Sequence, residues 1–304
     1  MTEPDEVPSS TPAALLTLVD GAHLEGGACL YSLIDGAQLV PATRIRLLAS
    51  GDVQCHSLLG ESARHDAMYA GPLLLRHVKG LRCEVLPRLL AIPGSAHFLS
   101  LLISHHPFAE LRDRLTWLTD VAHEDGTEWV MRYYDVRILP HWLEVLSETQ
   151  RAISLAYLAQ WLFIDAQGQV QQVDVGRGAV TAPFEGKPML LNERQCAQLL
   201  ERTLPYMLMN QLLDDDVHSL TAVPEHQRYG FFAQQLAKAS GYGLTGIADL
   251  KIYCWMAIMY GADFDMTPLA AEVLKHGFKA APFSERVLAW TPQQWAALEQ
   301  KTLL

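Results

Sequence analysis

The hydrophobic period of this chain changes once, and that change constrains the fold more than any other feature. Up to residue 175, apolar runs of strand length alternate with apolar residues at helical spacing, which is typical of a sheet with flanking helices. From residue 191 onward only the helical spacing remains. The stretch between them is rich in Gly and Pro and has no period. We therefore expect an α/β lobe over 11–175, a linker over 176–190 and an all-α helical lobe over 191–304.

The strand–helix alternation predicts a mixed sheet, at least partly parallel, with flanking helices. The expected strands cover 29–34, 53–58, 73–78, 96–104 and 129–134, with a hairpin over 161–175. In the second lobe, a capping box at Asn192–Gln195 precedes a long apolar stripe, in which Pro205 should kink or divide the helix. Further helices are expected over 224–239, 248–260, 268–276 and 292–301.

Composition narrows the environment and the kinds of partner. The net charge of −11, without a basic patch among aromatic residues, argues against a nucleic acid as partner. Five scattered cysteines without a CxxC pair indicate buried thiols in a reducing compartment. Residues 1–10 are acidic and rich in Pro and Ser, which predicts a disordered tail and not a signal peptide. The longest apolar run, Ile252–Ala262, is too short to insert across a membrane, so we expect a cytoplasmic protein.

The motifs that could carry chemistry are incomplete. Gly241-Tyr-Gly243-Leu-Thr-Gly246 fits the spacing of a dinucleotide-binding loop, but a helix and not a strand is expected before it, so an interhelical loop explains it better. No HExxH pattern and no G-x-S-x-G elbow occurs. We therefore expect no metal, no cofactor and no enzymatic activity.

The stretch 128–150 carries charges inside an apolar run. Arg132 and Asp135 bracket Tyr133 and Tyr134, and a buried charge needs a partner. We expect a structural ion pair that fixes a strand-to-helix turn, with a tyrosine hydroxyl as its third member. Behind it, Ser147–Gln150 predicts a capping box at the start of a second helix.

Two places are candidates for contact with a partner protein. Arg137, His141 and Trp142 directly follow the expected turn. Trp255 and Met259 lie in a segment that is apolar on every helical face, which predicts either a central buried helix or a helix that offers one face to a partner. Met and Trp suit adaptable binding surfaces.

Four short motifs together resemble a family of bacterial type VI secretion adaptors. They are Tyr31–Gly36, Ser57–Gly60, Gly71–Leu75 and Arg132–Asp135. Members of this family are chaperones that load toxic effectors onto the secretion spike. The resemblance implies a non-enzymatic adaptor that binds a cognate effector, through the effector's N-terminal region, and delivers it to the spike protein VgrG.

Two other functions stay open at this point. The chain could be a hydrolase whose acids and histidines are scattered in the sequence and gathered by the fold. It could also be a structural component of the secretion apparatus, which would affect the secretion of all cargo and not of one effector.

Overall fold

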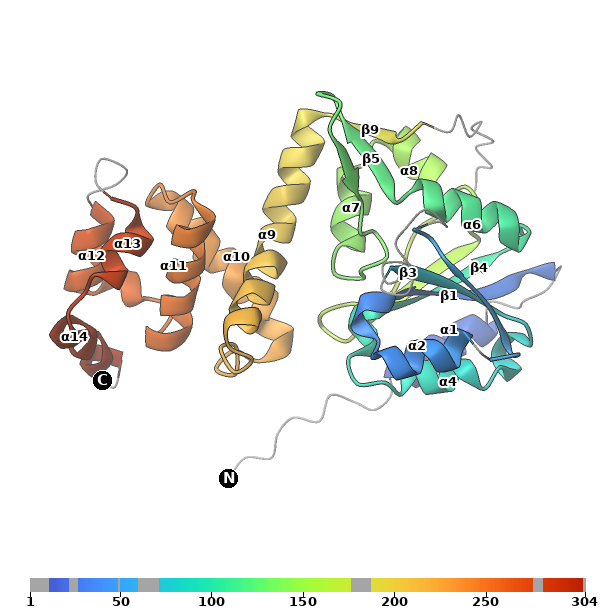
Figure 1. Ribbon diagram of the computed structural model, residues 1–304, viewed down its shortest axis with the longest axis horizontal. Helices are drawn as coiled ribbons and strands as arrows, with labels where there is room; N and C mark the ends of the chain where they lie inside the picture. Colours follow the sequence, from blue (N-terminus) through green and yellow to red (C-terminus); the bar gives the residue numbers. More distant parts are fainter. Residues whose placement is uncertain are drawn as a thin grey trace. The chain divides into compact units, whose positions relative to one another are not determined.

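The computed structural model describes residues 11–21, 27–48, 50–59, 71–175, 187–275 and 281–302 (Figure 1). The predicted tail, 1–10, and residues 176–186 of the predicted linker lie outside the described residues. The contacts divide the chain into two compact units, Met1–Glu201 and Arg202–Leu304. The predicted fold class, an α/β lobe followed by an all-helical lobe, is confirmed.

The first unit is built on a six-stranded sheet in the order β2-β3-β1-β4-β7-β8, in which every neighbouring pair is antiparallel. Its strands are β1 (Cys29–Asp35), β2 (Val53–Ser57), β3 (Pro72–His77), β4 (Leu99–Ser104), β7 (Gln160–Ile164) and β8 (Val170–Gln172). Our expectation of partly parallel strands is wrong for this sheet.

Helices cover both faces of this sheet, and this explains the error. Figure 1 shows α1, α2 and α4 on one side and α6, α7 and α8 on the other. The sheet's side chains therefore divide between two cores, and β4 is buried at every position. A continuous apolar run is the usual mark of a parallel strand, but an antiparallel strand buried on both faces has the same pattern. The helices are α1 (Thr11–Gly21), α2 (Pro41–Leu48), α4 (Val85–Leu90), α5 (Ser95–Phe98), α6 (Phe108–Trp117), α7 (Leu139–Val145) and α8 (Glu148–Leu155), with short 3₁₀ turns η2 (Gly36–Gln38) and η3 (Gly80–Arg82).

A second, three-stranded sheet has the order β6-β5-β9, with β5 (Asp120–His123), β6 (Glu128–Val130) and β9 (Met189–Leu191). The β5–β9 pair is parallel. The strand expected over 129–134 stops at Val130, and β5 was missed because only four residues form it. The strand β9 begins in the predicted linker, ends at Leu191 and pairs with β5, and the first unit extends to Glu201, past the boundary that we expected at residue 191.

Both predicted capping boxes are present, and they bond to each other. Ser147 and Gln150 cap the start of α8 reciprocally, and Asn192 and Gln195 do the same at the start of α9. Gln195 Nε2 donates to Gln150 Oε1 at 2.6 Å and to the Val145 carbonyl at 2.8 Å. The two local helix-start signals thereby also fix the ends of α7, α8 and α9 together.

The described residues of the second unit form helices joined by turns and loops, with no strand among them. Its helices are the later turns of α9 (Glu193–Asp215), α10 (Glu225–Gly241), α11 (Ile247–Tyr260), α12 (Pro268–Lys275), α13 (Phe283–Leu288) and α14 (Pro292–Thr302), with a 3₁₀ turn η4 (Phe264–Met266). The helix α9 runs through Pro205 without being divided there. Three of the five cysteines, Cys83, Cys196 and Cys254, are buried as expected, while Cys29 and Cys55 are partly exposed, and all five are free thiols.

Gln235 is a polar residue in the core of the second unit whose side chain makes no hydrogen bond to the described residues. Its side chain is fully buried in α10, and neither its Nε2 nor its Oε1 has a hydrogen-bond partner among the described residues. Burying an unpaired amide disfavours folding by about 1–3 kcal/mol.

We predict that Gln235→Met stabilises the protein by about 1–2 kcal/mol, because methionine has a similar shape and no unpaired polar atoms. Urea unfolding followed by circular dichroism measures the change. The matched control is Gln195→Met, which removes a buried amide whose hydrogen bonds are all made and should destabilise. A loss of stability in Gln235→Met would show that this amide has a partner in solution.

Candidate functional site

Asp35 brings a carboxylate to the buried end of the central strand. It is the last residue of β1, and alternation along the strand places it on the same face as Tyr31 and Leu33, toward α6 and α7. Its exposed fraction is 2 %. Its Oδ1 accepts the backbone N–H of Ala37 at 3.2 Å, which caps the turn η2 and leaves Oδ2 for another donor.

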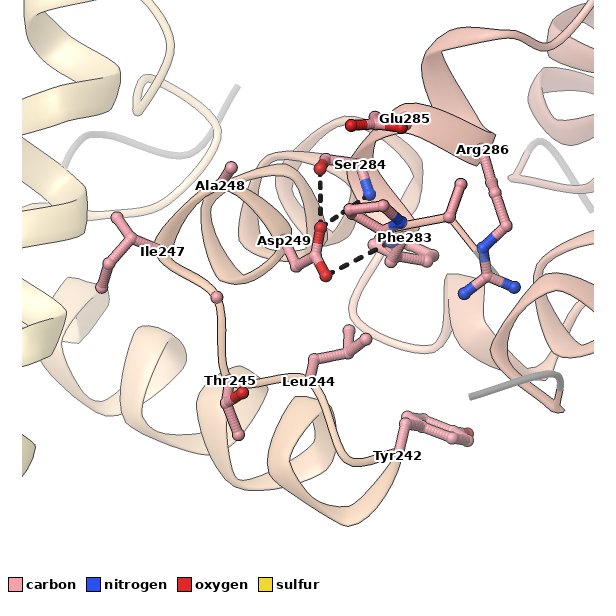
Figure 2. Close-up of a pocket in the computed structure, with 13 residues that line it drawn as sticks. Tyr242, Leu244, Thr245, Ile247, Ala248, Asp249, Phe283, Ser284, Glu285 and Arg286 are labelled. Carbon is pink, nitrogen blue, oxygen red and sulfur yellow. Dashed lines mark hydrogen bonds between the residues drawn. The ribbon is translucent and has the colours of Figure 1, made fainter. Parts of the chain in front are cut away.

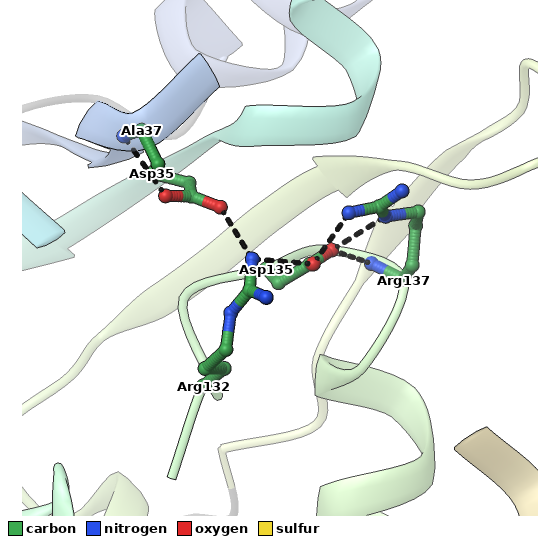
Figure 3. Close-up of polar contacts among 5 residues, drawn as sticks. All are labelled: Asp35, Ala37, Arg132, Asp135 and Arg137. Atoms are coloured by element: carbon green, nitrogen blue, oxygen red, sulfur yellow. Dashed lines mark hydrogen bonds and ion pairs between the residues drawn. The ribbon is translucent and has the colours of Figure 1, made fainter. Parts of the chain in front are cut away.

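Arg132 supplies that donor. Its Nη2 lies 2.8 Å from Asp35 Oδ2 and 3.3 Å from Asp135 Oδ2 (Figure 3). The guanidinium side chain is 46 % exposed, whereas both carboxylates are almost completely buried. Burial lowers the pKa of Arg132, but the charges of Asp135 and Asp35 outweigh burial and raise the pKa above its ordinary value, so the side chain stays a cation.

Asp135 is the centre of the cluster. Its Oδ1 accepts from the backbone N–H and the Nε of Arg137 at 3.0 and 2.9 Å, and its Oδ2 accepts from Arg137 Nη2 at 2.7 Å (Figure 3). Its carbonyl accepts the backbone N–H groups of Ile138 and Leu139 at the start of α7. One side chain therefore fixes the turn and holds two guanidinium groups. We call Asp35, Arg132, Asp135 and Arg137 the aspartate–arginine cluster.

The two tyrosines of the motif have different roles, and one of them, Tyr134, interacts with the Arg132 side chain, as expected for the third member of the ion pair. The Tyr133 hydroxyl donates to the Leu115 carbonyl at 2.6 Å, away from the ion pair, and its ring packs edge-on against Trp161. Burial raises the pKa of Tyr134, and the Arg132 cation opposes that rise. The additional carboxylate, Asp35, is the member that sequence reasoning missed. A signal for it is present in the sequence, because Asp35 lies in the motif Tyr31–Gly36, which resembles the adaptor family.

The chemistry available to the aspartate–arginine cluster is recognition and bracing. Two carboxylates and two guanidinium groups balance in charge, and each carboxylate oxygen already accepts a hydrogen bond. A general base must reach its substrate, and both carboxylates are only 2 % exposed. The guanidinium side chains are the parts of the cluster that reach solvent, Arg132 more than Arg137.

The three residues expected to contact a partner near the turn differ in how much of each side chain is exposed. Arg137 is bound to Asp135, and its side chain is 20 % exposed. His141 is partly exposed on α7. Trp142 has no exposed surface and packs in the core of the first unit. Our assignment of Trp142 as a contact residue is therefore corrected, because an indole on the inner face of α7 stabilises the core and cannot touch a partner.

In the second unit, α11 has an apolar outer face. Tyr253, Cys254 and Met256 are fully buried on its inner side. On the outer side Ile252 and Trp255 are half-buried, and Met259 is 52 % exposed. Tyr260, the last residue of α11, and Trp295, from α14, extend this surface. Their ring centroids are 5.8 Å apart, and the ring centroid of Trp255 lies 6.1 Å from that of Trp295. We call Ile252, Trp255, Met259, Tyr260 and Trp295 the α11 face.

The glycine motif lines a cavity of about 470 Å³ at the start of α11 (Figure 2). As expected it is an interhelical loop, with α10 before it and α11 after it. The Asp249 carboxylate accepts the backbone N–H groups of Phe283 and Ser284, at 3.2 and 2.8 Å, and the Ser284 hydroxyl at 2.6 Å. This carboxylate caps α13, and the lining of the cavity also contains Glu285 and Arg286.

A buried serine–histidine pair is the nearest approach to a hydrolase site. His77 Nε2 lies 2.7 Å from Ser32 Oγ, between β3 and β1. The two residues are 3 % and 0 % exposed, and His77 Nδ1 has no hydrogen-bond partner among the described residues. Both residues therefore belong to the packed interior of the first unit.

Two further observations concern the described residues as a whole. In them, no three His, Cys, Asp or Glu side chains gather in a way that could hold a metal ion. None of the helices in the described ranges combines the length and the apolar character needed to cross a bilayer.

Comparison with known proteins gives one match. Residues 30–152 match the model of a family described as a domain of unknown function, DUF4123. This range contains all four residues of the aspartate–arginine cluster and ends in α8. Neither the curated proteins nor the solved structures contain a match to the chain.

We predict that Asp135→Ala destabilises the protein by about 2–3 kcal/mol, because it removes the acceptor of two guanidinium groups. The cost is below that of a fully buried pair because Arg132 and Arg137 can both reach water. Urea unfolding measures it. Asp113→Ala, at a carboxylate that is 60 % exposed, is the control and should change stability by less than about 0.5 kcal/mol. If the two variants lowered the free energy of unfolding equally, Asp135 would not be a brace of the turn.

We also predict a pH dependence of stability from His77. Burial lowers the pKa of His77 from its ordinary 6.5 to about 4. Between these values the unfolded chain binds a proton that the folded protein excludes, so stability falls as the pH falls from about 6.5 to about 4, by on the order of 3 kcal/mol. In urea unfolding at several pH values, His77→Gln should lose most of this slope. The control is His105→Gln at an exposed position, which should keep it.

Proposed function

We propose that this protein is a non-enzymatic adaptor and chaperone that binds a type VI secretion effector and loads it onto the VgrG spike. The observation that carries the binding part of the proposal is the α11 face. A surface helix normally has polar residues on its outer side, whereas here Ile252, Trp255 and Met259 occupy that side. Aromatic residues and methionine are enriched at the centres of protein interfaces.

The assignment to type VI secretion is supported by the motifs and by the family match. The family whose model matches residues 30–152 is associated with type VI secretion effector adaptors. Two of the motifs that resemble such adaptors, Tyr31–Gly36 and Arg132–Asp135, meet in space through the Arg132–Asp35 ion pair. Because the two motifs together build one turn, there is a physical reason why a family should contain both of them.

The mechanism that we propose is binding without a covalent step. An effector segment, from its N-terminal region, covers its own apolar residues against the α11 face and is thereby kept from aggregating. Release follows when the loaded complex docks on VgrG. The half-buried rings of Trp255 and Trp295 already contact each other, so little side-chain entropy is lost when a partner covers them.

The direct test is co-purification with the product of a toxin gene next to a spike gene in the same genome. We expect the tagged adaptor to retain that effector through size-exclusion chromatography, and deletion of the adaptor to abolish secretion of this effector alone. Loss of secretion of every cargo would instead indicate a structural component of the apparatus. An effector that stays soluble and is secreted normally without this protein would contradict the proposal.

We predict that Met259→Asp weakens effector binding at least tenfold, because it places a charge at the most exposed residue of the apolar α11 face. The matched control is Met266→Asp, since Met266 lies in η4 and is 74 % exposed. Isothermal titration with the purified effector measures both. If the two variants bind with equal affinity, the α11 face is not the binding surface. A thermal unfolding curve of each variant shows that the comparison is made between folded proteins.

A further inference from the structure

The two edges of the three-stranded sheet differ in whether their outward backbone N–H and C=O groups have hydrogen-bond partners. On β9, the outer carbonyl of Leu190 accepts a hydrogen bond of 2.7 Å from Gln150 Nε2, so α8 covers that edge. On β6, at the opposite edge, no side chain or strand in the described ranges bonds to the outward backbone groups. An uncovered edge is a template for another strand.

The hydrogen-bond ladder between β5 and β6 shows which groups of β6 point outward. The backbone bonds from Met131 to Thr119 and from His123 to Thr127 fix the phase of the β5–β6 ladder. Bonded and non-bonded residues alternate in an antiparallel pair, so Trp129 bonds to β5. The N–H and C=O groups of Glu128 and Val130 therefore point away from β5. They offer two donors and two acceptors to an incoming chain.

The exposed face of this sheet combines apolar and acidic side chains. Register places Val130 beside Asp120, and Glu128 and Leu190 beside Ala122, all on one face. Val130 and Leu190 are 60 % and 57 % exposed, while Val121, Met189 and Leu191 are buried on the other face. A strand added to β6 would therefore place its own alternate side chains next to a carboxylate and an aliphatic group.

The charge along this hairpin is of one sign. Asp120, Glu124, Asp125 and Glu128 are all exposed, and the sequence has no Lys or Arg between Arg114 and Arg132. Hydrogen bonds from Thr127, first from its backbone, together with His123, lower the pKa of Asp125 to about 2, so it stays ionised. Natural edges are commonly protected by lysine, proline or a bulge. The residues of β6, Glu128-Trp129-Val130, include no lysine or proline.

We propose that the free edge of β6 accepts an extended basic segment of a partner protein as a fourth strand. The segment has a Lys or Arg opposite Glu128 and an apolar residue two positions away, opposite Val130, because directly opposed side chains on one face contact each other. A second copy of this chain is a poor occupant, since β6-to-β6 pairing would bring two sets of four carboxylates together. This surface belongs to the first unit, and the proposal goes beyond the adaptor function. It does not depend on the adaptor proposal, and its outcome does not decide that proposal.

The experiment uses the full chain and a defined probe. The probe is an end-blocked, fluorescein-labelled octapeptide of alternating lysine and valine, and binding is measured by fluorescence anisotropy at physiological salt. The first control is the same peptide methylated at every backbone amide, which keeps the charge and removes the donors. We expect the methylated peptide to bind at least about tenfold more weakly, since each lost edge hydrogen bond reduces affinity severalfold.

Variants of the protein test the edge from its own side. Val130→Pro removes an outward N–H without removing a bond to β5, and a proline is tolerated at such an edge position. We expect it to weaken peptide binding about tenfold, whereas Val130→Thr should stay within about twofold. Glu128→Gln should weaken binding more than Glu148→Gln, which removes one carboxylate from the exposed start of α8.

Three results would overturn the proposal. One is equal binding of the plain and methylated peptides, which means that the attraction is electrostatic only. Another is unchanged binding by a folded Val130→Pro protein. The third is a dimer of the wild-type chain in sedimentation that Val130→Pro abolishes, which makes a second copy the occupant. If Val130→Pro fails to fold, the methylated peptide against the wild-type protein still decides.

Discussion

The requirement that a buried carboxylate have a cationic or hydrogen-bonding partner organises the first unit. Asp35 ends the central strand on a face that the α6 and α7 layer covers, and Asp135 lies in the turn that starts α7. Both are 2 % exposed. One cation, Arg132, bonds to both carboxylates, so the end of the sheet and the start of the covering helix are held together. Removing either carboxylate leaves the guanidinium with fewer acceptors, although its exposure to water limits the cost.

The same layer arrangement explains why the strands are so apolar. A sheet with helices on both faces has two cores to fill, so successive residues of a strand are all buried. The helices before β4 (α1, α2 and α4) cover one face of the sheet, and the helices after β4 (α6, α7 and α8) cover the other. Among the polar residues that remain inside, Trp161 Nε1 donates to Ser100 Oγ at 2.9 Å across the neighbouring strands β7 and β4. They specify register without offering chemistry.

The two surfaces that we propose for binding lie where one face of a helix or one edge of a sheet is not covered by the rest of its unit. The α11 face is the outer side of a helix whose inner side fills the core of the second unit. The β6 edge is the end of a small sheet whose other edge is bonded by Gln150. The first surface is apolar and aromatic, and the second combines backbone donors with carboxylates. They suit a helix or an apolar segment in one case and a basic extended segment in the other.

Local signals were sufficient to predict several elements. The capping boxes at Ser147–Gln150 and Asn192–Gln195 were read correctly because a cap depends on side chains three residues apart. The order of elements and the change to helices alone followed from hydrophobic period, which is also a local property. The Arg132–Asp135 pair could be predicted for the same reason, since its members are close in the chain.

The tertiary structure decided what depends on residues distant in sequence. Strand direction, the parallel β5–β9 pair and the addition of Asp35 to the cluster depend on which segments meet, and a hydrophobic period is the same for any of these pairings. Burial separated Trp142 from Met259, although both are large apolar residues on helices, because only packing decides which face of a helix turns inward. The sequence by itself thus determined the elements and their local caps, and tertiary packing determined their partners and the surfaces left for binding.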